Sequence, residues 1–179
     1  PPVNMADAKT WPGENGLSLV FTIHYGPFVY YTGGDCGGVV SYGDPLWKDV
    51  ETPVAEVVGE VDIATLDHQG NRDAVNEFQV KTFKPRVWIQ QSWSSDHPGE
   101  EVLRRLTTPY LYEGPRDLFT TNMLESNRHV IGPLIDRSYK SLQGHIMLLS
   151  STTAGLICRL KMYLALTCQK RENRRWSSF

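Results

Sequence analysis

Residues 57–83 read VVGEVDIATLDHQGNRDAVNEFQVKTF, and this stretch decides the fold that we expect. The run from Val57 through Leu66 is typical of a strand. It stops at the polar residues 67–71, and residues 73–83 then place apolar side chains at helical spacing. An order of strand, polar tip and helix is typical of layered α/β domains.

Similar elements are expected on both sides of this stretch. Residues 17–24 alternate apolar and polar side chains, and the turn Tyr25-Gly26-Pro27 leads into residues 28–32, which together predict a β-hairpin. Later residues repeat the order of strand, polar tip and helix at 87–89, 90–98 and 99–106, and further strands are expected at 117–121 and 144–149. The sequence therefore predicts an α/β fold with a mixed sheet flanked by helices.

Composition indicates one globular domain. The 179 residues are 40% apolar and 21% charged, and no apolar run reaches the roughly 18 residues of a membrane-spanning helix. The start lacks the pattern of a signal peptide. Because the chain opens on proline, we expect it to begin within a longer protein. Three widely spaced cysteines favour a reducing compartment, so we expect a cytoplasmic protein without a membrane partner.

Charge is distributed unevenly along the chain. Residues 158–179 carry six Lys or Arg and one Glu, so the overall charge of −2 leaves −7 on the rest. An acidic body does not favour nucleic acid as a partner. Apolar residues in 156–164 recur at helical spacing, which predicts a C-terminal helix with a basic end. The alternative is a shifted reading frame near residue 150, which would make the basic tail, 151–179, foreign to the fold.

Three polar tips of predicted strands carry candidate metal ligands: Asp35, the pair Asp67 and His68, and the turn that ends in His97. Ligands of layered α/β folds bind at the carboxyl ends of strands, and carboxylates and imidazoles coordinate Zn²⁺. In the alternative interpretation the aspartates cap turns or helices, and the histidines are ordinary polar residues.

Two further alternatives concern the same tips. We expect His97 to contact substrate at the mouth of the site, unless the residues before it, 94–96, cap the following helix. Cys36 follows Asp35 directly, so a thiolate nucleophile activated by His68 or His97 is a rival hypothesis.

Residues 16–35 and 62–71 resemble the C-terminal half of metallo-β-lactamase-fold hydrolases, in the branch related to the competence protein ComEC. In that branch a hairpin strand leads into a Gly-Asp pair whose carboxylate bridges two metals, and a later strand leads into His-His-Gly. Asp35 matches the bridging carboxylate, and His68 matches the first histidine. The resemblance covers residues 15–150.

The resemblance implies that residues 1–150 are the C-terminal half of an αββα sandwich. It also implies one or two divalent metal ions, such as zinc, bound by Asp35 and His68. The reaction would be hydrolysis by a water molecule whose pKa the metal lowers to about 7. The substrate would be a small molecule or a phosphodiester, and the fold does not choose between them.

Two departures from the family pattern reduce the expected activity. Gln69 stands where the second histidine is common, and no His-x-His-x-Asp-His motif precedes Asp35. Catalytic zinc usually takes three protein ligands, so two are too few. We therefore expect a fragment or a degenerate remnant that binds metal weakly or not at all and is inactive alone. The alternative function is a non-catalytic interaction domain that pairs with a separate N-terminal half.

Overall fold

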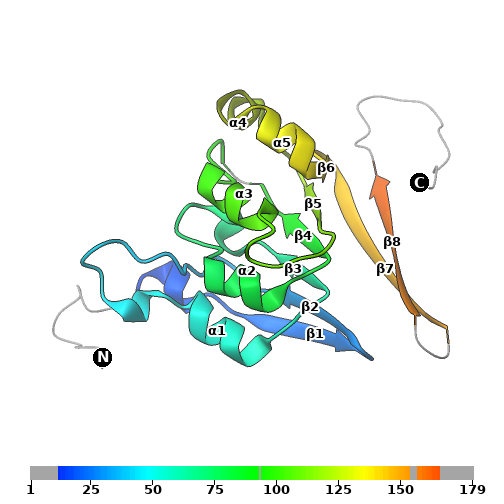
Figure 1. The fold of residues 1–179 in the computed structure, drawn as a ribbon, viewed down its shortest axis with the longest axis horizontal. Coiled ribbons are helices and arrows are strands. Elements are labelled where there is room, and N and C mark those ends of the chain that lie inside the picture. Colours follow the sequence, from blue (N-terminus) through cyan, green and yellow to red (C-terminus); the bar gives the residue numbers. More distant parts are fainter. Residues whose placement is uncertain (1–11, 93, 154–156, 166–179) are drawn as a thin grey trace.

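A six-stranded mixed sheet forms the centre of the computed structural model, which describes residues 12–92, 94–153 and 157–165 (Figure 1). The strands follow one another in sequence order. β1 and β2 pair antiparallel, and each later neighbour in this sheet is parallel. The α/β class with a mixed sheet is confirmed. The strands are β1 (Phe21–Tyr25), β2 (Phe28–Thr32), β3 (Ile63–Thr65), β4 (Val87–Gln90), β5 (Asp117–Thr120) and β6 (Tyr139–Ser141).

Three helices cover one face of this sheet, and two more follow β5 at the β6 end (Figure 1). The covered face contains the larger core, which includes Tyr31, Trp88, Leu103 and Leu118. In the described ranges no helix combines the length and apolarity needed to cross a bilayer. The helices are α1 (Glu51–Val58), α2 (Glu77–Phe83), α3 (Glu100–Thr107), α4 (Glu125–Ile131) and α5 (Pro133–Ser138), with 3₁₀ turns η2 (Glu14–Leu17), η3 (Leu46–Lys48) and η4 (Asp67–Gly70).

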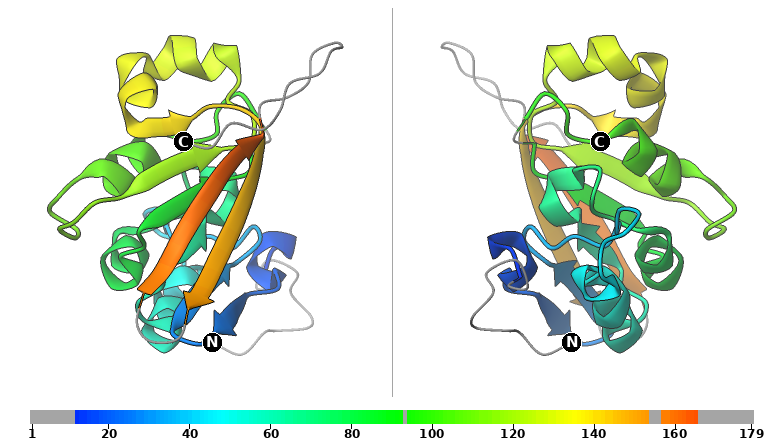
Figure 2. Two further views of the ribbon diagram at one scale, coloured as in Figure 1. Left: turned by 90° about the vertical axis from the view of Figure 1, so that its right-hand side faces the viewer. Right: turned by 90° about the vertical axis from the view of Figure 1, so that its left-hand side faces the viewer.

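The opposite face of the sheet is crossed by a long antiparallel hairpin, β7 (His145–Thr153) and β8 (Ile157–Ala165) (Figure 2). A second, smaller core lies on this face. Its buried members are one or two residues from each of β3, β4 and β5: Ile63, Val87, Ile89 and Phe119. Ile146 and Leu148 of β7 pack against them. The hairpin therefore supplies part of the cover of the second face.

The start of the deciding stretch differs from its prediction. Val57 and Val58 belong to α1 rather than to a strand, and only Ile63–Thr65 pairs with neighbours. Pro53 is compatible with the helix because it lies in the first turn, where backbone N–H groups need no helical partner. The helix expected at residues 73–83 begins only at Glu77, where the Asn76 side chain accepts a hydrogen bond from the Gln79 amide at 2.8 Å.

The helix expected in the C-terminal segment is wrong, because residues 157–165 form β8. The sequence there also alternates, with Leu160, Met162 and Leu164 between Arg159, Lys161 and Tyr163, and this period of two is typical of a strand. β7 runs through residue 150, so no element boundary falls at that position. Residues 166–179 of the expected basic tail lie outside the described residues, and the shifted reading frame stays a prediction.

Candidate functional site

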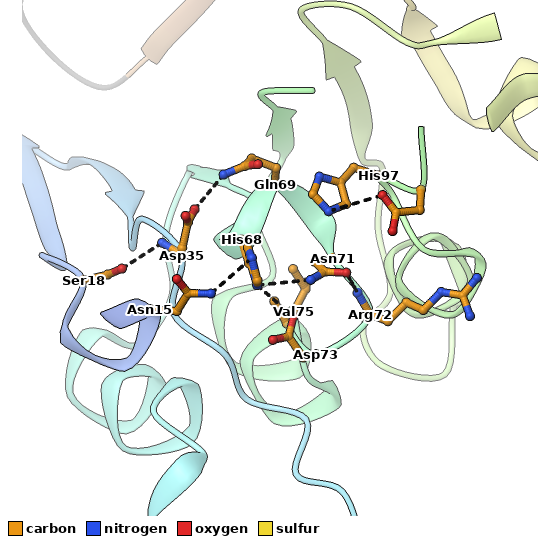
Figure 3. Close-up of polar contacts among 12 residues, drawn as sticks. Asn15, Ser18, Asp35, His68, Gln69, Asn71, Arg72, Asp73, Val75 and His97 are labelled. Atoms are coloured by element: carbon orange, nitrogen blue, oxygen red, sulfur yellow. Dashed lines mark hydrogen bonds and ion pairs between the residues drawn. The ribbon is translucent and has the colours of Figure 1, made fainter. Parts of the chain in front are cut away.

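Three candidate residues of the sequence follow three neighbouring strands. Asp35 follows β2, His68 follows β3, and His97 lies in the turn after β4. These strands are parallel neighbours, so their carboxyl ends share one edge of the sheet. Figure 3 shows the three side chains at this edge. The fold brings together residues that are more than 60 positions apart in sequence.

Asp35 is half-buried and is fixed from two directions. Its backbone N–H donates to Ser18 Oγ at 3.1 Å, and its Oδ1 accepts a hydrogen bond from Gln69 Nε2 at 2.6 Å. The amide of His68 donates to the carbonyl of Gly34 at 2.8 Å, directly before Asp35. The carboxyl ends of β2 and β3 are therefore joined, and Asp35 binds a side chain rather than capping a helix.

His68 sits on a strained backbone within η4. Its φ is 45°, and the φ of Gln69 is 53°, a left-handed conformation that costs energy for residues other than glycine. The imidazole is mostly covered, with 17% of the side chain exposed. Its Nδ1 lies 2.9 Å from Asp73 Oδ1, and its Nε2 lies 3.3 Å from Asn15 Nδ2. Strained conformations of this kind concentrate at functional sites.

His97 is buried and its ring centre lies 6.1 Å from that of His68. Its Nε2 is 3.8 Å from Asp96 Oδ1, and among the described residues its Nδ1 has no hydrogen-bond partner. Burial lowers the pKa of His97, so the imidazole is neutral at neutral pH. The capping alternative for the preceding residues is wrong, because the N-cap of α3 is Gly99 and no side chain caps it.

Asp67 lies beneath the site as a buried carboxylate. Its Oδ2 accepts hydrogen bonds from Tyr31 Oη at 2.9 Å and from Gln79 Nε2 at 2.6 Å. Its Oδ1 has no partner among the described residues. Burial raises its pKa to about 7, although both hydrogen bonds oppose the shift. A side chain at Gly33 would clash with Oδ1, so only glycine fits beside it.

The donor chemistry of Asp35 and His68 fits a divalent metal such as zinc, because one offers a carboxylate oxygen and the other an imidazole nitrogen. Two ligands are too few to complete a metal site. In the part of the chain that the structure describes, no group of three or more His, Cys, Asp or Glu side chains is arranged to hold a metal ion. Asp35 and His68 therefore supply two side chains of suitable chemistry, fewer than the three protein ligands that catalytic zinc usually takes.

Cys36 does not have the properties of an activated nucleophile. Its side chain is buried, and burial raises the pKa of the thiol to about 11. Reactive cysteines need a thiolate at neutral pH, which positive neighbours or a helix N-terminus promote. Asp67, Glu51 and Asp35 raise the pKa further, so this environment opposes the thiolate hypothesis.

Sequence reasoning missed two contacts of the site. Asp73 and Asn15 hold the two nitrogens of His68, yet they lie 5 and 53 positions away in the sequence. Asp73 stands where a helix was predicted. An Asp shortly after a His is too common to indicate an orienting role without the turn of η4 between them.

Comparison with protein-family models, curated proteins and solved structures finds no match for this chain.

Proposed function

We propose that this chain carries part of the site of a metal-dependent hydrolase of the metallo-β-lactamase superfamily, with Asp35 and His68 as metal ligands. The observation that supports it is the joined edge of β2 and β3. There the fold holds a carboxylate and an imidazole next to each other through the His68 to Gly34 hydrogen bond and the Gln69 to Asp35 hydrogen bond.

The roles of the side chains follow from their chemistry. A divalent metal bound at this edge would lower the pKa of water to about 7 and so supply a nucleophile at neutral pH. Asp35 would contribute negative charge, and His68 a neutral nitrogen. His97 would contact the substrate, because its neutral ring lies beside His68 and its Nδ1 has no hydrogen-bond partner among the described residues. A small molecule and a phosphodiester both fit this proposal.

Metal binding by this chain alone is expected to be weak. Two protein ligands are fewer than the usual three, and the amide of Gln69 occupies one oxygen of Asp35. We infer that the chain alone is an incomplete catalyst.

Titration with Zn²⁺ tests this proposal. We expect one weak binding event in calorimetry, with the largest NMR shifts at His68, and its loss in Asp35→Ala and His68→Ala. His129→Ala is the matched control, because this exposed imidazole lies on α4. Absence of zinc binding, or binding that survives both site substitutions, would contradict the proposed ligands. Stoichiometric submicromolar binding would contradict the inferred incompleteness.

The second candidate function is a non-catalytic interaction domain that pairs with a separate N-terminal half. The edge strand β1 favours it, because Phe21, Ile23 and Tyr25 alternate on one face and are each about half exposed. Residues 16–34 contain no Lys, Arg, Asp or Glu. Edge strands usually carry charges or other protection against pairing, so an uncharged apolar edge marks an association surface.

Sedimentation velocity with a chelator present separates this candidate from the metal site. Without its partner, an apolar edge strand tends to pair with a second copy. Association through β1 should therefore appear as a sedimentation coefficient that rises with protein concentration, and Ile23→Lys should abolish the rise. Val57→Lys is the control, since Val57 is exposed on α1. Equal behaviour of both variants would exclude β1 as the surface.

We also propose a cytoplasmic location. The three cysteines are too few and too scattered for a disulfide framework. Cys36, in the described part of the chain, is a free thiol. Thiol labelling of protein from fractionated cells would contradict this location if the chain were found with oxidised cysteines.

A further inference from the structure

The two nitrogens of His68 have partners of opposite chemistry. Asp73 Oδ1, 2.9 Å from Nδ1, belongs to a carboxylate that only accepts hydrogen bonds when ionised. Asn15 Nδ2, 3.3 Å from Nε2, belongs to an amide NH₂ that only donates. The neutral ring therefore carries its proton on Nδ1 and has its lone pair on Nε2.

Asp73 is itself held in place by the segment that follows Asp35. Its carbonyl oxygen accepts hydrogen bonds from the backbone N–H groups of Gly38 and Val39, both at 2.8 Å. The residue that holds the His68 ring is thus tied to the chain that carries the other candidate ligand.

The contact contributes little to stability by itself. The side chain of Asp73 is 51% exposed, and a pair of this exposure contributes about 0–1 kcal/mol. Its consequence is orientation, because it selects one tautomer and one ring rotation. A competing donor is close by, since Asn71 Nδ2 lies 3.4 Å from the same Nδ1. Without Asp73, that amide would favour the other tautomer, with the lone pair on Nδ1.

We propose that Asp73 is a positioning residue that fixes the Nδ1–H tautomer of His68 and so keeps the lone pair of Nε2 for a metal ion, which would displace the Asn15 amide from that nitrogen. This inference rests on the proposed function. Histidines that bind metals donate their other ring N–H to a carboxylate or carbonyl, and loss of such a partner typically costs about 10–100-fold in metal affinity.

The tautomer can be measured without any metal. Long-range ¹H–¹⁵N NMR spectra of the full chain distinguish the two nitrogens. They are recorded with a chelator present, at a pH about two units above the usual His pKa of about 6.5. His68→Ala assigns the signals. We expect the Nδ1–H form in the wild type and a mixture in Asp73→Ala. Asp73→Asn should retain the Nδ1–H form, because its side-chain oxygen still accepts a hydrogen bond.

A zinc titration then measures the consequence. We expect Asp73→Ala to weaken Zn²⁺ binding by about 10–100-fold and Asp73→Asn to weaken it less. Asp136→Ala is the matched control, because it removes an aspartate of similar exposure that pairs with Arg128 on the helices after β5. Thermal melts confirm that each variant is folded.

The outcomes separate the two proposals. An Nε2–H tautomer in the wild type, or a tautomer unchanged in Asp73→Ala, overturns the role of Asp73. So does a zinc affinity that Asp73→Ala and Asp136→Ala lower equally. A wild-type chain with the Nδ1–H tautomer that binds no zinc overturns the proposed hydrolase site, whereas the orienting role of Asp73 toward the ring is then supported by the tautomer alone.

Discussion

At the scale of single residues, Gln69 occupies one oxygen of Asp35, the proposed metal ligand. Its Nε2 donates to Asp35 Oδ1 at 2.6 Å, and a metal ion bound as proposed would have to displace this hydrogen bond. Gln69→His would replace the competing donor by a third ligand, and His tolerates the φ of 53° at this position better than most residues. We expect Zn²⁺ affinity to rise by about tenfold or more, which corresponds to about 1.4 kcal/mol. Calorimetry measures the Zn²⁺ affinity, and Gln143→His is the control because Gln143 is exposed. Equal affinities of the two variants would show that Gln69 does not obstruct the site.

Asp67 predicts a second residue-level effect, on stability against pH. Its pKa is about 7 in the folded chain and near 3.8 when unfolded, so the folded state binds more protons between these values. The free energy of unfolding therefore falls as pH rises from about 4 to about 7, by up to about 4 kcal/mol.

Urea unfolding at several pH values, with a chelator present, measures this dependence. Asp67→Asn should flatten the curve, because the amide stays neutral and its oxygen can still accept from Tyr31 and Gln79. Glu51 is a second buried carboxylate near Asp67, and burial raises its pKa well above the usual value. A slope that remains unchanged in Asp67→Asn would assign the dependence to Glu51 or to another group.

At the scale of elements, α1 holds the loop between η4 and α2 by hydrogen bonds. Glu51, at the start of α1, accepts hydrogen bonds from the amides of Val75 at 2.5 Å and Asn76 at 2.6 Å. Val75 has a φ of 56°, a strained value for a β-branched residue. Arg105 of α3 donates to the carbonyls of Ala74 and Val75. Two helices therefore hold the loop that carries Asp73.

Removing one acceptor oxygen of Glu51 should weaken the hydrogen bonding of this loop to α1. Glu51→Gln has a single side-chain oxygen, so one buried amide would lose its partner, at a cost of about 1–3 kcal/mol in the free energy of unfolding. Chemical denaturation measures the loss, and Glu56→Gln on the exposed side of α1 is the control. If both variants lose the same stability, Glu51 has no special role in holding the loop.

Prediction of the elements succeeded where the pattern is local and failed where distant residues impose the conformation. The alternation of residues 17–24 located the β1–β2 hairpin because a partly exposed strand shows its period locally, although β1 begins only at Phe21 and Leu17 ends η2. The start of α2 was misplaced because Val75 and Asn76 follow a conformation imposed by Glu51, 24 and 25 positions away. The strand ends that hold Asp35 and His68 were predictable from polar tips after apolar runs. Their partners Asn15 and Asp73 were not, because tertiary packing alone brings them to the ring.

At the scale of the whole molecule, the two faces of the sheet are covered unequally. Helices α1, α2 and α3 cover one face with a large core, whereas the β7–β8 hairpin crosses the other (Figures 1 and 2). The apolar side chains of β1 point to this second face, because Ile23 pairs with Tyr30, and Tyr30 pairs with Ile63 of the second core. Among the described residues, the exposed part of the second face thus includes the association surface proposed for β1.

Because the two faces of the sheet are covered unequally, two leucine truncations should lower the free energy of unfolding by different amounts. Leu103 is fully buried in the larger core, so Leu103→Ala should lower the free energy of unfolding by about 2–5 kcal/mol. Leu148 of β7 is only partly buried against Ile89 and its neighbours, so Leu148→Ala should cost about 1–2 kcal/mol, near the value of a partly lost apolar contact. Urea denaturation measures both. A Leu148→Ala variant as stable as the wild type would show that the Leu148 contact does not stabilise the second face. Among the described residues, Ile146 would then be the side chain of β7 that holds the hairpin against this core.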